Sequence, residues 1–241
     1  MIFDIVIPLG PNELYIFNEN LKTIKENVIG YRNIYIITAN TNIILDDCII
    51  INEELFPFKM SDIELYIKNK DRNGWYLQQL LKLYAGFYIP HISENYLVID
   101  SDLHFLKKIN FFENERPIYT ISNEYHPPYF THMNRMHISF VKKYNISGIS
   151  HHMIFNIKYI QEIFDIVENT HNIPFWKVFL SVVNENESES GASEYELYFN
   201  YVLKYDIIIR ELEWTNLSLD DFINKRYNPN SDYVSICSYM N

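Results

Sequence analysis

One apolar stretch near the middle of the chain ends in two aspartates one residue apart, and it limits the fold more than any other feature. It reads Tyr96-Leu-Val-Ile-Asp100-Ser-Asp102. A short apolar run bounded by polar residues predicts a buried strand, and ligands of α/β sheets sit where such strands end. Side chains alternate along extended chain, so Asp100 and Asp102 point to the same side. Two carboxylates suit a divalent cation, Mn²⁺ or Mg²⁺, that also carries substrate phosphates.

The competing interpretation is an acidic turn that follows a strand and has no ligand. Against it, Asp100-Ser-Asp102 is the only Asp-x-Asp in the sequence, and it closes the most strand-like segment. An acidic turn without a ligand would require neither a unique motif nor this position at the end of a strand. We therefore expect a metal site here.

Composition and charge limit the possible partners. The chain has 241 residues, is 48% hydrophobic, and shows no linker, repeat or low-complexity block, which favours one folded domain over residues 1–241. A formal net charge of -11 disfavours nucleic acid, so a phosphate-bearing ligand must meet a metal or a few local cations. No apolar run is long enough for a transmembrane segment, and the N-terminus lacks the pattern of a signal peptide. Only two cysteines are present, which fits a cytoplasmic location, in the host cytoplasm if the chain is viral.

The order of predicted elements indicates an α/β fold. A strand, a Gly-Pro turn and an amphipathic helix open the chain, as in nucleotide-binding α/β units. We predict strands at 2–8, 31–38, 48–51, 96–100, 117–121 and 207–209, a strand ending at 155, and a short extended piece at 105–109. Helices are predicted up to about residue 28 and at 61–68, 75–85, 131–144, 157–167, 174–183 and 193–204. The segment 122–128 is too proline-rich to be regular, and the last 30 residues are mixed.

Polar residues around the helix 75–85 are candidates for ligand binding. Lys70 and Arg72 precede its N-terminus, where basic residues suit an anion such as a diphosphate; charges on a surface loop are the alternative. Gln78, Gln79 and Lys82 fall largely off the helix's apolar face. Either one amide of the Gln78-Gln79 pair reaches a ligand, or these residues form a solvated helix face.

Two further groups carry possible site chemistry. His151-His152 opens a strand, and one imidazole could complete a metal site; alternation lets at most one of them do so, and a packed structural histidine is the alternative for each. Ser61 with Glu64 and Ser193 with Glu196 have capping-box spacing. This use of Glu196 leaves Glu194 free at the first turn, where its carboxylate could take a proton from an acceptor hydroxyl.

Five segments together resemble one known family. They are Asp4-Ile-Val-Ile-Pro-Leu-Gly10, Gly74-Trp-Tyr-Leu-Gln-Gln-Leu-Leu-Lys82, Val98-Ile-Asp-Ser-Asp102, Ser150-His-His152 and Ser193-Glu-Tyr-Glu-Leu-Tyr198. In this order they resemble GT-A-fold glycosyltransferases of bacteria and large DNA viruses, and a chlorella-virus glycosyltransferase domain is a similar small member. The resemblance implies a single GT-A-type, Rossmann-like α/β domain whose mixed, mostly parallel central sheet is flanked by helices. Its nucleotide-binding half would be about 1–105 and its acceptor-binding half about 106–241.

The resemblance also implies a reaction and a set of site residues. A sugar would pass from a nucleotide diphosphate sugar, expected to be UDP-linked, to a hydroxyl acceptor on a glycan, protein or small molecule, with Mn²⁺ or Mg²⁺ as cofactor. The metal set is Asp100, Asp102, His151 and His152, and the catalytic set is Glu194 and Asp102. The donor-binding set has Pro8, Gly10 and Thr38 beside the nucleoside and Arg72 and Lys82 near the phosphates or sugar. It also includes Lys70, Gln79, Asp100 and Ser101.

Two other functions compete with this prediction. A non-catalytic module that binds nucleotide sugars fits the small size. An Asp-x-Asp phosphatase or phosphomutase uses its first aspartate as nucleophile. That class carries its motif on the first strand with Thr or Val two residues later, whereas His104 follows here. Whether a transferase would invert or retain configuration, and the oligomeric state, stay open.

Overall fold

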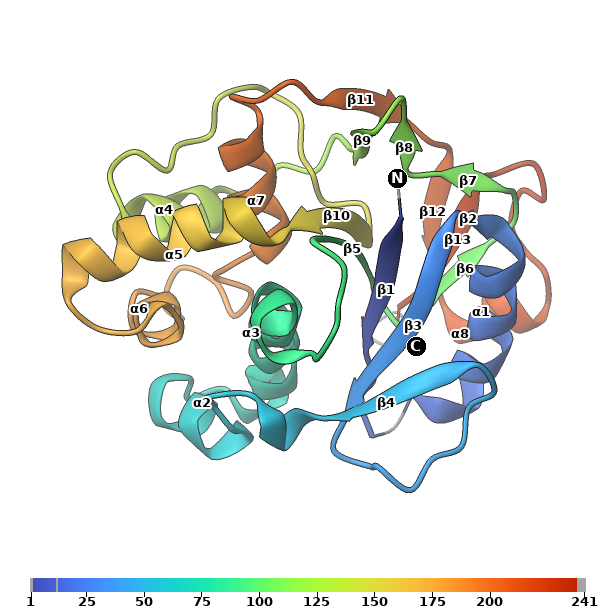
Figure 1. The fold of residues 1–241 in the computed structure, drawn as a ribbon, viewed down its shortest axis with the longest axis horizontal. Helices are drawn as coiled ribbons and strands as arrows, with labels where there is room; N and C mark the ends of the chain where they lie inside the picture. Colours follow the sequence, from blue (N-terminus) through green and yellow to red (C-terminus); the bar gives the residue numbers. More distant parts are fainter. Residues whose placement is uncertain (1, 12, 238–241) are drawn as a thin grey trace.

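The computed structural model describes residues 2–11 and 13–237. Its centre is a five-stranded sheet in the order β10-β5-β1-β3-β4 (Figure 1). The strands β1 (Phe3–Pro8), β3 (Tyr31–Thr38), β4 (Cys48–Asn52) and β5 (Asn95–Ile99) run parallel, and β10 (His152–Asn156) is antiparallel to β5. The predicted mixed, mostly parallel α/β fold with flanking helices is therefore confirmed.

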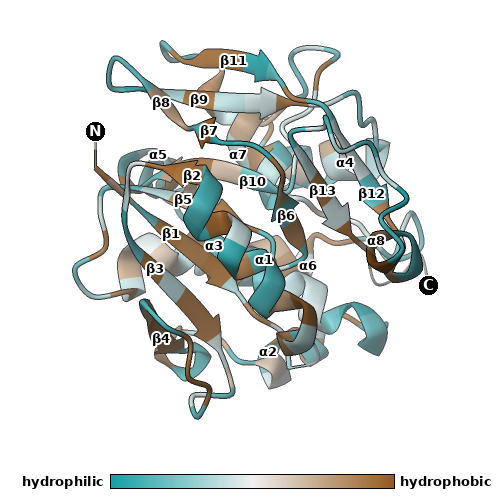
Figure 2. Ribbon diagram, turned by 90° about the vertical axis from the view of Figure 1, so that its right-hand side faces the viewer, coloured by the Kyte–Doolittle hydropathy of each residue, from teal (hydrophilic) through white to brown (hydrophobic). Residues whose placement is uncertain are grey.

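The central strands are apolar because both faces of the sheet are covered. Along β1, Val6 packs into one core, whereas Ile5 and Ile7 pack into the other. This alternation is expected of extended chain, and burial on both faces explains the continuous apolar runs. Figure 2 shows the resulting hydrophobic colouring of β1 and β3.

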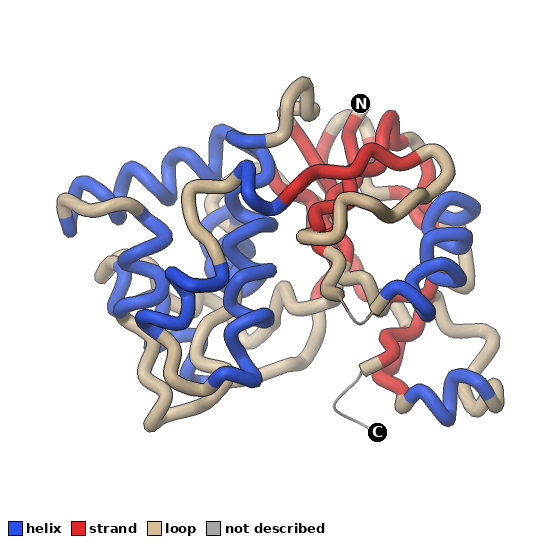
Figure 3. The backbone as a smooth tube through the Cα atoms, turned by 90° about the horizontal axis from the view of Figure 1, so that it is seen from below, coloured by secondary structure: helices blue, strands red, loops and turns tan. Residues whose placement is uncertain are grey.

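Helices cover the two faces unequally. Helix α1 (Leu14–Asn27) lies on one face, and most other helices lie on the opposite face (Figures 1 and 3). That larger group comprises α2 (Met60–Tyr66), α3 (Asn73–Tyr88), α4 (Pro127–Met136), α5 (Ile157–His171), α6 (Phe175–Ser181) and α7 (Glu194–Val202). Short 3-10 turns span Glu53–Leu55 and Lys70–Arg72.

Small sheets extend the fold beyond the central one. Strand β2 (Val28–Ile29) pairs with β7 (Ile109–Asn110), and β9 (Arg116–Ile121) pairs with both β8 (Phe112–Glu113) and β11 (Ile208–Glu211). The last residues, which were only mixed in pattern, form β12 (Trp214–Leu217), α8 (Leu219–Ile223) and β13 (Tyr233–Ile236). Strand β13 lies between β12 and β6 (Leu103–Phe105). Strand β6 begins directly after Asp102.

The one charged residue in β1 is satisfied by a dense set of donors. The carboxylate of Asp4 is fully buried, and the Arg32 guanidinium donates to both of its oxygens at 3.0 and 2.6 Å. The backbone N–H groups of Asn33 and Ser93 also donate to it. Burial alone would raise the pKa of Asp4, but these donors outweigh it and hold the pKa below its usual value.

Several predicted helix boundaries are wrong, and for two helices the cause is clear. Helix α4 spans Pro127–Met136 instead of 131–144, because proline is well suited to the first turn of a helix and His137 is already extended. Helix α2 begins at Met60, before Ser61, and the Asp62 carboxylate caps it by accepting from the N–H of Lys59 at 2.8 Å. Within residues 2–11 and 13–237, no helix has both the length and the apolar character needed to cross a bilayer.

Candidate metal site

The candidate site lies where the direction of strand order reverses. From β1 the chain builds β3 and β4 on one side and then returns to place β5 on the other side of β1. Open α/β sheets bind ligands in the crevice at such a point, beyond the carboxyl ends of the strands. Gly10 follows β1 there, and Asp100 and Asp102 follow β5.

Three side chains converge at this point. One ligand atom from each of Asp100, Asp102 and His151 lies within 4.8 Å of the others. His151 directly precedes the antiparallel strand β10. The N–H of Asp100 donates to the carbonyl oxygen of His151 at 2.9 Å. The Nδ1 atom of His151 lies 3.2 Å from Oδ2 of Asp100. All three residues are partly exposed, so a ligand can reach them.

The two neighbouring histidines point to different surroundings. His151 has a φ of 62°, in the left-handed region that a non-glycine residue rarely adopts. The ring of His152 is instead buried among Phe105, Phe111 and Tyr233. The structure thus brings His151, and not His152, to the aspartates.

The three residues fit a divalent cation. Oδ1 of Asp102 is buried and has no hydrogen-bond partner among the described residues. Such an orphaned oxygen is costly unless a ligand satisfies it. Burial raises the pKa of Asp102 to about 6, and the nearby charge of Asp100 acts in the same direction. Two carboxylates and one imidazole are ligand types that Mn²⁺ accepts.

A buried lysine joins two of the predicted residues. Nζ of Lys82, from α3, lies 2.5 Å from Oδ1 of Asp100 and 2.7 Å from Oε1 of Glu194, at the start of α7. The side chain of Lys82 is 3% exposed, so the alternative of a solvated helix face is wrong for this residue. The hydroxyl of Tyr195 donates to the same Asp100 oxygen at 2.9 Å. The beginning of α7 therefore covers this face of α3.

The charges of this cluster shift one another. Burial would lower the pKa of Lys82, but its two carboxylate partners outweigh this and raise the pKa. Burial would raise the pKa of Asp100, but Lys82 and His151 outweigh it and hold the pKa far below its usual value. For Glu194 burial prevails over Lys82, and its pKa is raised. At neutral pH the cluster is held together by a charged lysine.

Gln79 fixes the start of α7. Its Oε1 accepts from the backbone N–H of Glu194 at 3.1 Å, which orients the amide. Its Nε2 is buried and has no partner among the described residues. Because Oε1 must be the acceptor, Nε2 is a donor left for a ligand, and Gln79 does not lie on a solvated face.

Glu13, which the sequence did not single out, contacts two residues of the predicted donor-binding set. Oε2 of Glu13 accepts from the Gly10 N–H at 3.0 Å and from the Ser101 hydroxyl at 2.6 Å. Pro8 is buried at the end of β1, and the Thr38 hydroxyl accepts from a neighbouring backbone N–H after β3. Glu13 is polar and exposed in a turn, so nothing in its sequence context marks it.

The basic loop lies at the N-terminal end of α3, whereas Lys82 lies further along the same helix. Lys70 and Arg72 occupy the 3-10 turn before α3, and the Arg72 guanidinium lies 6.0 Å from the Trp75 ring centre. Among the described residues, no hydrogen bond or ion pair joins either one to Asp100 or Asp102.

The second predicted capping box is only half correct. The Ser193 hydroxyl accepts from the N–H of Glu196 at 3.2 Å, as an N-cap does. The Glu196 carboxylate does not return to Ser193; it accepts from the Ser147 hydroxyl at 2.7 Å and the Gly148 N–H at 3.3 Å, and it pairs with Lys142. Glu196 thus anchors the segment that leads to His151, a distant contact that local spacing cannot reveal.

Fold and site together define an α/β protein with a candidate divalent-metal site at the switch point of its central sheet. The chain belongs to DUF6492, a family of unknown function whose model matches residues 31–220. A search of curated proteins finds no match.

Solved structures that align with most of the chain include the following two. The apo form of mouse xyloside xylosyltransferase 1 is 11% identical, with a TM-score of 0.45 over 100% of this chain and 99% of that one. An active-site mutant of LgtC is 12% identical, with a TM-score of 0.49 over 98% of this chain and 88% of that one. TM-scores below 0.5 do not establish a common fold.

Proposed function

We propose that the protein is a metal-dependent glycosyltransferase of the GT-A type that uses a nucleotide diphosphate sugar as donor. The observation that carries this proposal is the grouping of Asp100, Asp102 and His151 at the switch point, beside the Lys82–Glu194 ion pair. A chain with a net charge of -11 needs a cation to hold a diphosphate, and this grouping supplies the ligands for one. The five sequence segments that resemble GT-A glycosyltransferases support the same conclusion.

The donor would bind across the ends of β1 and β5. A divalent cation held by Asp100, Asp102 and His151 would offset the charge that develops on the leaving diphosphate. Lys82 adds a fixed positive charge next to Asp100. The Nε2 atom of Gln79, which has no hydrogen-bond partner among the described residues, would donate to a hydroxyl of the nucleotide sugar.

The nucleoside would lie at the turn after β1. Pro8, Gly10, Thr38 and Ser101 end or follow neighbouring strands there. The Glu13 carboxylate, which Gly10 and Ser101 hold in place, could accept from ribose hydroxyls. We propose UDP as the nucleotide of the donor.

Glu194 is the proposed base on the acceptor side. Burial raises its pKa, which makes its carboxylate a better proton acceptor, and the lysine partner keeps it in place. The acceptor hydroxyl would give its proton to Glu194 while its oxygen attacks the anomeric carbon and the nucleoside diphosphate leaves. The acceptor would be a glycan, a protein or a small molecule.

One observation favours a second candidate, a non-catalytic module that binds nucleotide sugars. The side chain of Glu194 is only 4% exposed, and one of its oxygens is already paired with Lys82, which describes a site without a free base. A phosphatase receives no such support.

A panel of nucleotide sugars with Mn²⁺ tests the proposal. Transferases hydrolyse their donor slowly when no acceptor is present, so we expect release of a nucleoside diphosphate from one donor class. Asp102→Asn should abolish this release. Donor binding without release would favour the binding module, and release of inorganic phosphate from a phosphomonoester would contradict both.

A further inference from the structure

The C-terminal strand contacts the candidate metal site from outside the part of the chain that the family model matches. Strand β13 lies beyond residue 220, yet it pairs antiparallel with β6, which follows Asp102 directly. The N–H of Ile236 donates to the carbonyl oxygen of Asp102 at 3.0 Å. The backbone of one proposed metal ligand is therefore fixed by the end of the chain.

The same strand reaches the backbone that carries His151. The hydroxyl of Tyr233, a fully buried residue, donates to the carbonyl oxygen of Ser150 at 3.0 Å. Two residues further on, the Ser235 hydroxyl lies 3.5 Å from Nδ1 of His151.

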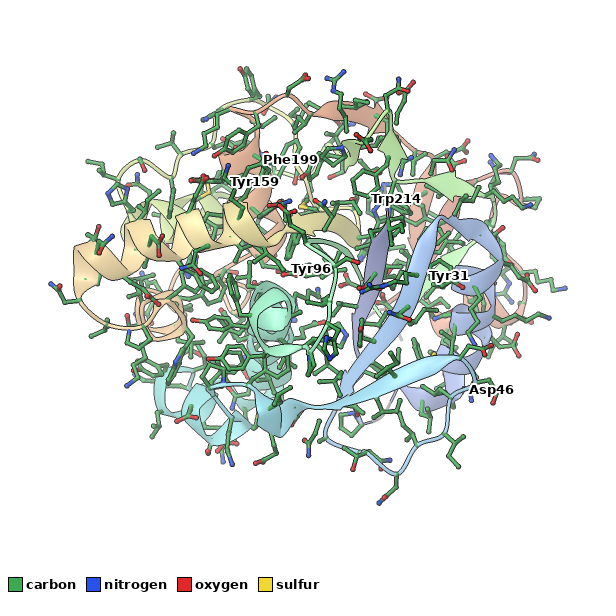
Figure 4. The ribbon with its side chains drawn as sticks, viewed as in Figure 1. Tyr31, Asp46, Tyr96, Tyr159, Phe199 and Trp214 are labelled. Carbon is green, nitrogen blue, oxygen red and sulfur yellow. The ribbon has the colours of Figure 1, made fainter. Side chains whose placement is uncertain are left out.

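Trp214, on the neighbouring strand β12, holds the imidazole ring itself. Its ring centre lies 4.9 Å from that of His151, in an edge-to-face arrangement at 83°. On its other side Trp214 stacks on Tyr233 at 5.5 Å with the ring planes 9° apart. Figure 4 labels Trp214 at this junction of the C-terminal strands with the central sheet.

His151 needs such support because its backbone is strained. A non-glycine residue at positive φ costs about 1–2 kcal/mol relative to ordinary conformations, and such strain persists only where the surroundings enforce it. His151 lies just before β10, and its carbonyl oxygen accepts a hydrogen bond from the N–H of Asp100. The Tyr233 hydroxyl fixes the peptide on the other side of the same residue.

We propose that β12 and β13 position His151 for metal binding, through Trp214, Tyr233 and Ser235. This inference rests on the proposed metal site and adds three positioning residues to it. None of the three needs to touch the cation. They hold the left-handed backbone and the ring orientation that let Asp100, Asp102 and His151 converge.

The test is the affinity for Mn²⁺ alone, measured by isothermal titration with the full chain and no nucleotide. Tyr233→Phe removes the hydroxyl and keeps the ring. Loss of an outer contact to a metal ligand typically weakens metal binding by about 10–100-fold, and we expect about tenfold here. Trp214→Leu should weaken binding to a similar extent.

Tyr84→Phe is the matched control. Its buried hydroxyl accepts from the backbone N–H of Trp176 at 3.1 Å, within the helical core and away from the cluster. Both tyrosine variants lose one buried hydrogen bond to the backbone, so a purely structural role predicts similar losses of thermal stability. Only Tyr233→Phe should change the affinity for Mn²⁺.

The outcomes separate this inference from the proposed function. If the wild-type protein binds Mn²⁺ and Tyr233→Phe binds it within twofold, the positioning role is overturned while the metal site stands. If the wild-type protein binds no Mn²⁺, both are overturned. Should Tyr233→Phe fail to fold, Ser235→Ala replaces it, with a several-fold weaker affinity expected and an unchanged affinity counting against the inference.

Discussion

Replacing Lys82 by methionine should destabilise the metal-free protein strongly. The ammonium group lies 2.5 Å from Asp100 and 2.7 Å from Glu194, and its side chain is almost fully buried. At an effective dielectric constant of about 20, one ion pair at such a separation contributes about 6 kcal/mol of Coulomb energy, which the desolvation of the charges offsets in large part. Methionine fills a similar volume but leaves the buried carboxylate of Glu194 and the partly exposed carboxylate of Asp100 without their shared cation. Breaking a buried pair in this way typically costs about 3–5 kcal/mol.

That loss can be measured as a melting temperature. For a chain of this length, each kcal/mol shifts the midpoint by about 2–4 °C, so Lys82→Met should melt about 6–20 °C lower by calorimetry. Added Mn²⁺ should recover more of the midpoint in this variant than in the wild type, because a cation near Asp100 replaces part of the lost charge.

The matched control is Lys59→Met. Lys59 also lies 2.5 Å from a carboxylate oxygen, of Glu54, but both side chains are exposed. Exposed pairs typically contribute about 0–1 kcal/mol, so this variant should melt close to the wild type. If Lys82→Met loses no more stability than Lys59→Met, the assigned role of the buried cluster is wrong.

Three further predictions test other parts of the structure. Asp4 has a lowered pKa in the folded state, so its contribution to stability is present above its unfolded pKa of about 3.9 and is lost as pH falls through the folded pKa. Acid unfolding monitored by circular dichroism should therefore show a smaller loss of stability below pH 4 for Asp4→Asn than for the wild type. An equal loss of stability would contradict this. A Cβ at Gly148 would lie 2.5 Å from the Cβ of Phe199, so Gly148→Ala should cost about 1–3 kcal/mol in urea unfolding, whereas Gly74→Ala, in open helical surroundings, should stabilise by up to about 1 kcal/mol. Glu194→Gln should slow sugar transfer by about 10²–10⁴-fold with donor affinity retained, and full activity would exclude Glu194 as the base.

The sequence predicts the central sheet well because burial on both faces leaves a plain trace. Strands such as β1 and β5 are short, mostly apolar runs, as expected of strands that are covered on both faces. The carboxyl end of β5 brings Asp100 and Asp102 into one cluster, but a turn does this in place of the predicted extended chain: the N–H of Leu103 donates to the carbonyl oxygen of Asp100 at 3.1 Å. Only His151 of the two histidines faces the aspartates, and this depends on its left-handed backbone and on the pairing of β10 with β5, which the sequence pattern does not reveal.

Contacts between distant segments are what the sequence cannot supply. Lys82 and Glu194 stand 112 positions apart, and only the packing of α7 against α3 makes them partners. Glu196 has the spacing of a capping residue, yet a lysine and a turn from elsewhere in the chain compete successfully for its carboxylate. Strand β13 is four residues long and leaves no clear pattern until β6 is seen beside it.

The central claim is that Asp100, Asp102 and His151 hold a divalent cation that binds the diphosphate of a nucleotide sugar. Titration of UDP by calorimetry, with and without Mn²⁺, tests it most directly. We predict that the wild-type protein binds UDP only when Mn²⁺ is present and that Asp102→Ala abolishes this binding. UDP binding that is equally tight without metal, or unchanged in Asp102→Ala, would contradict the claim.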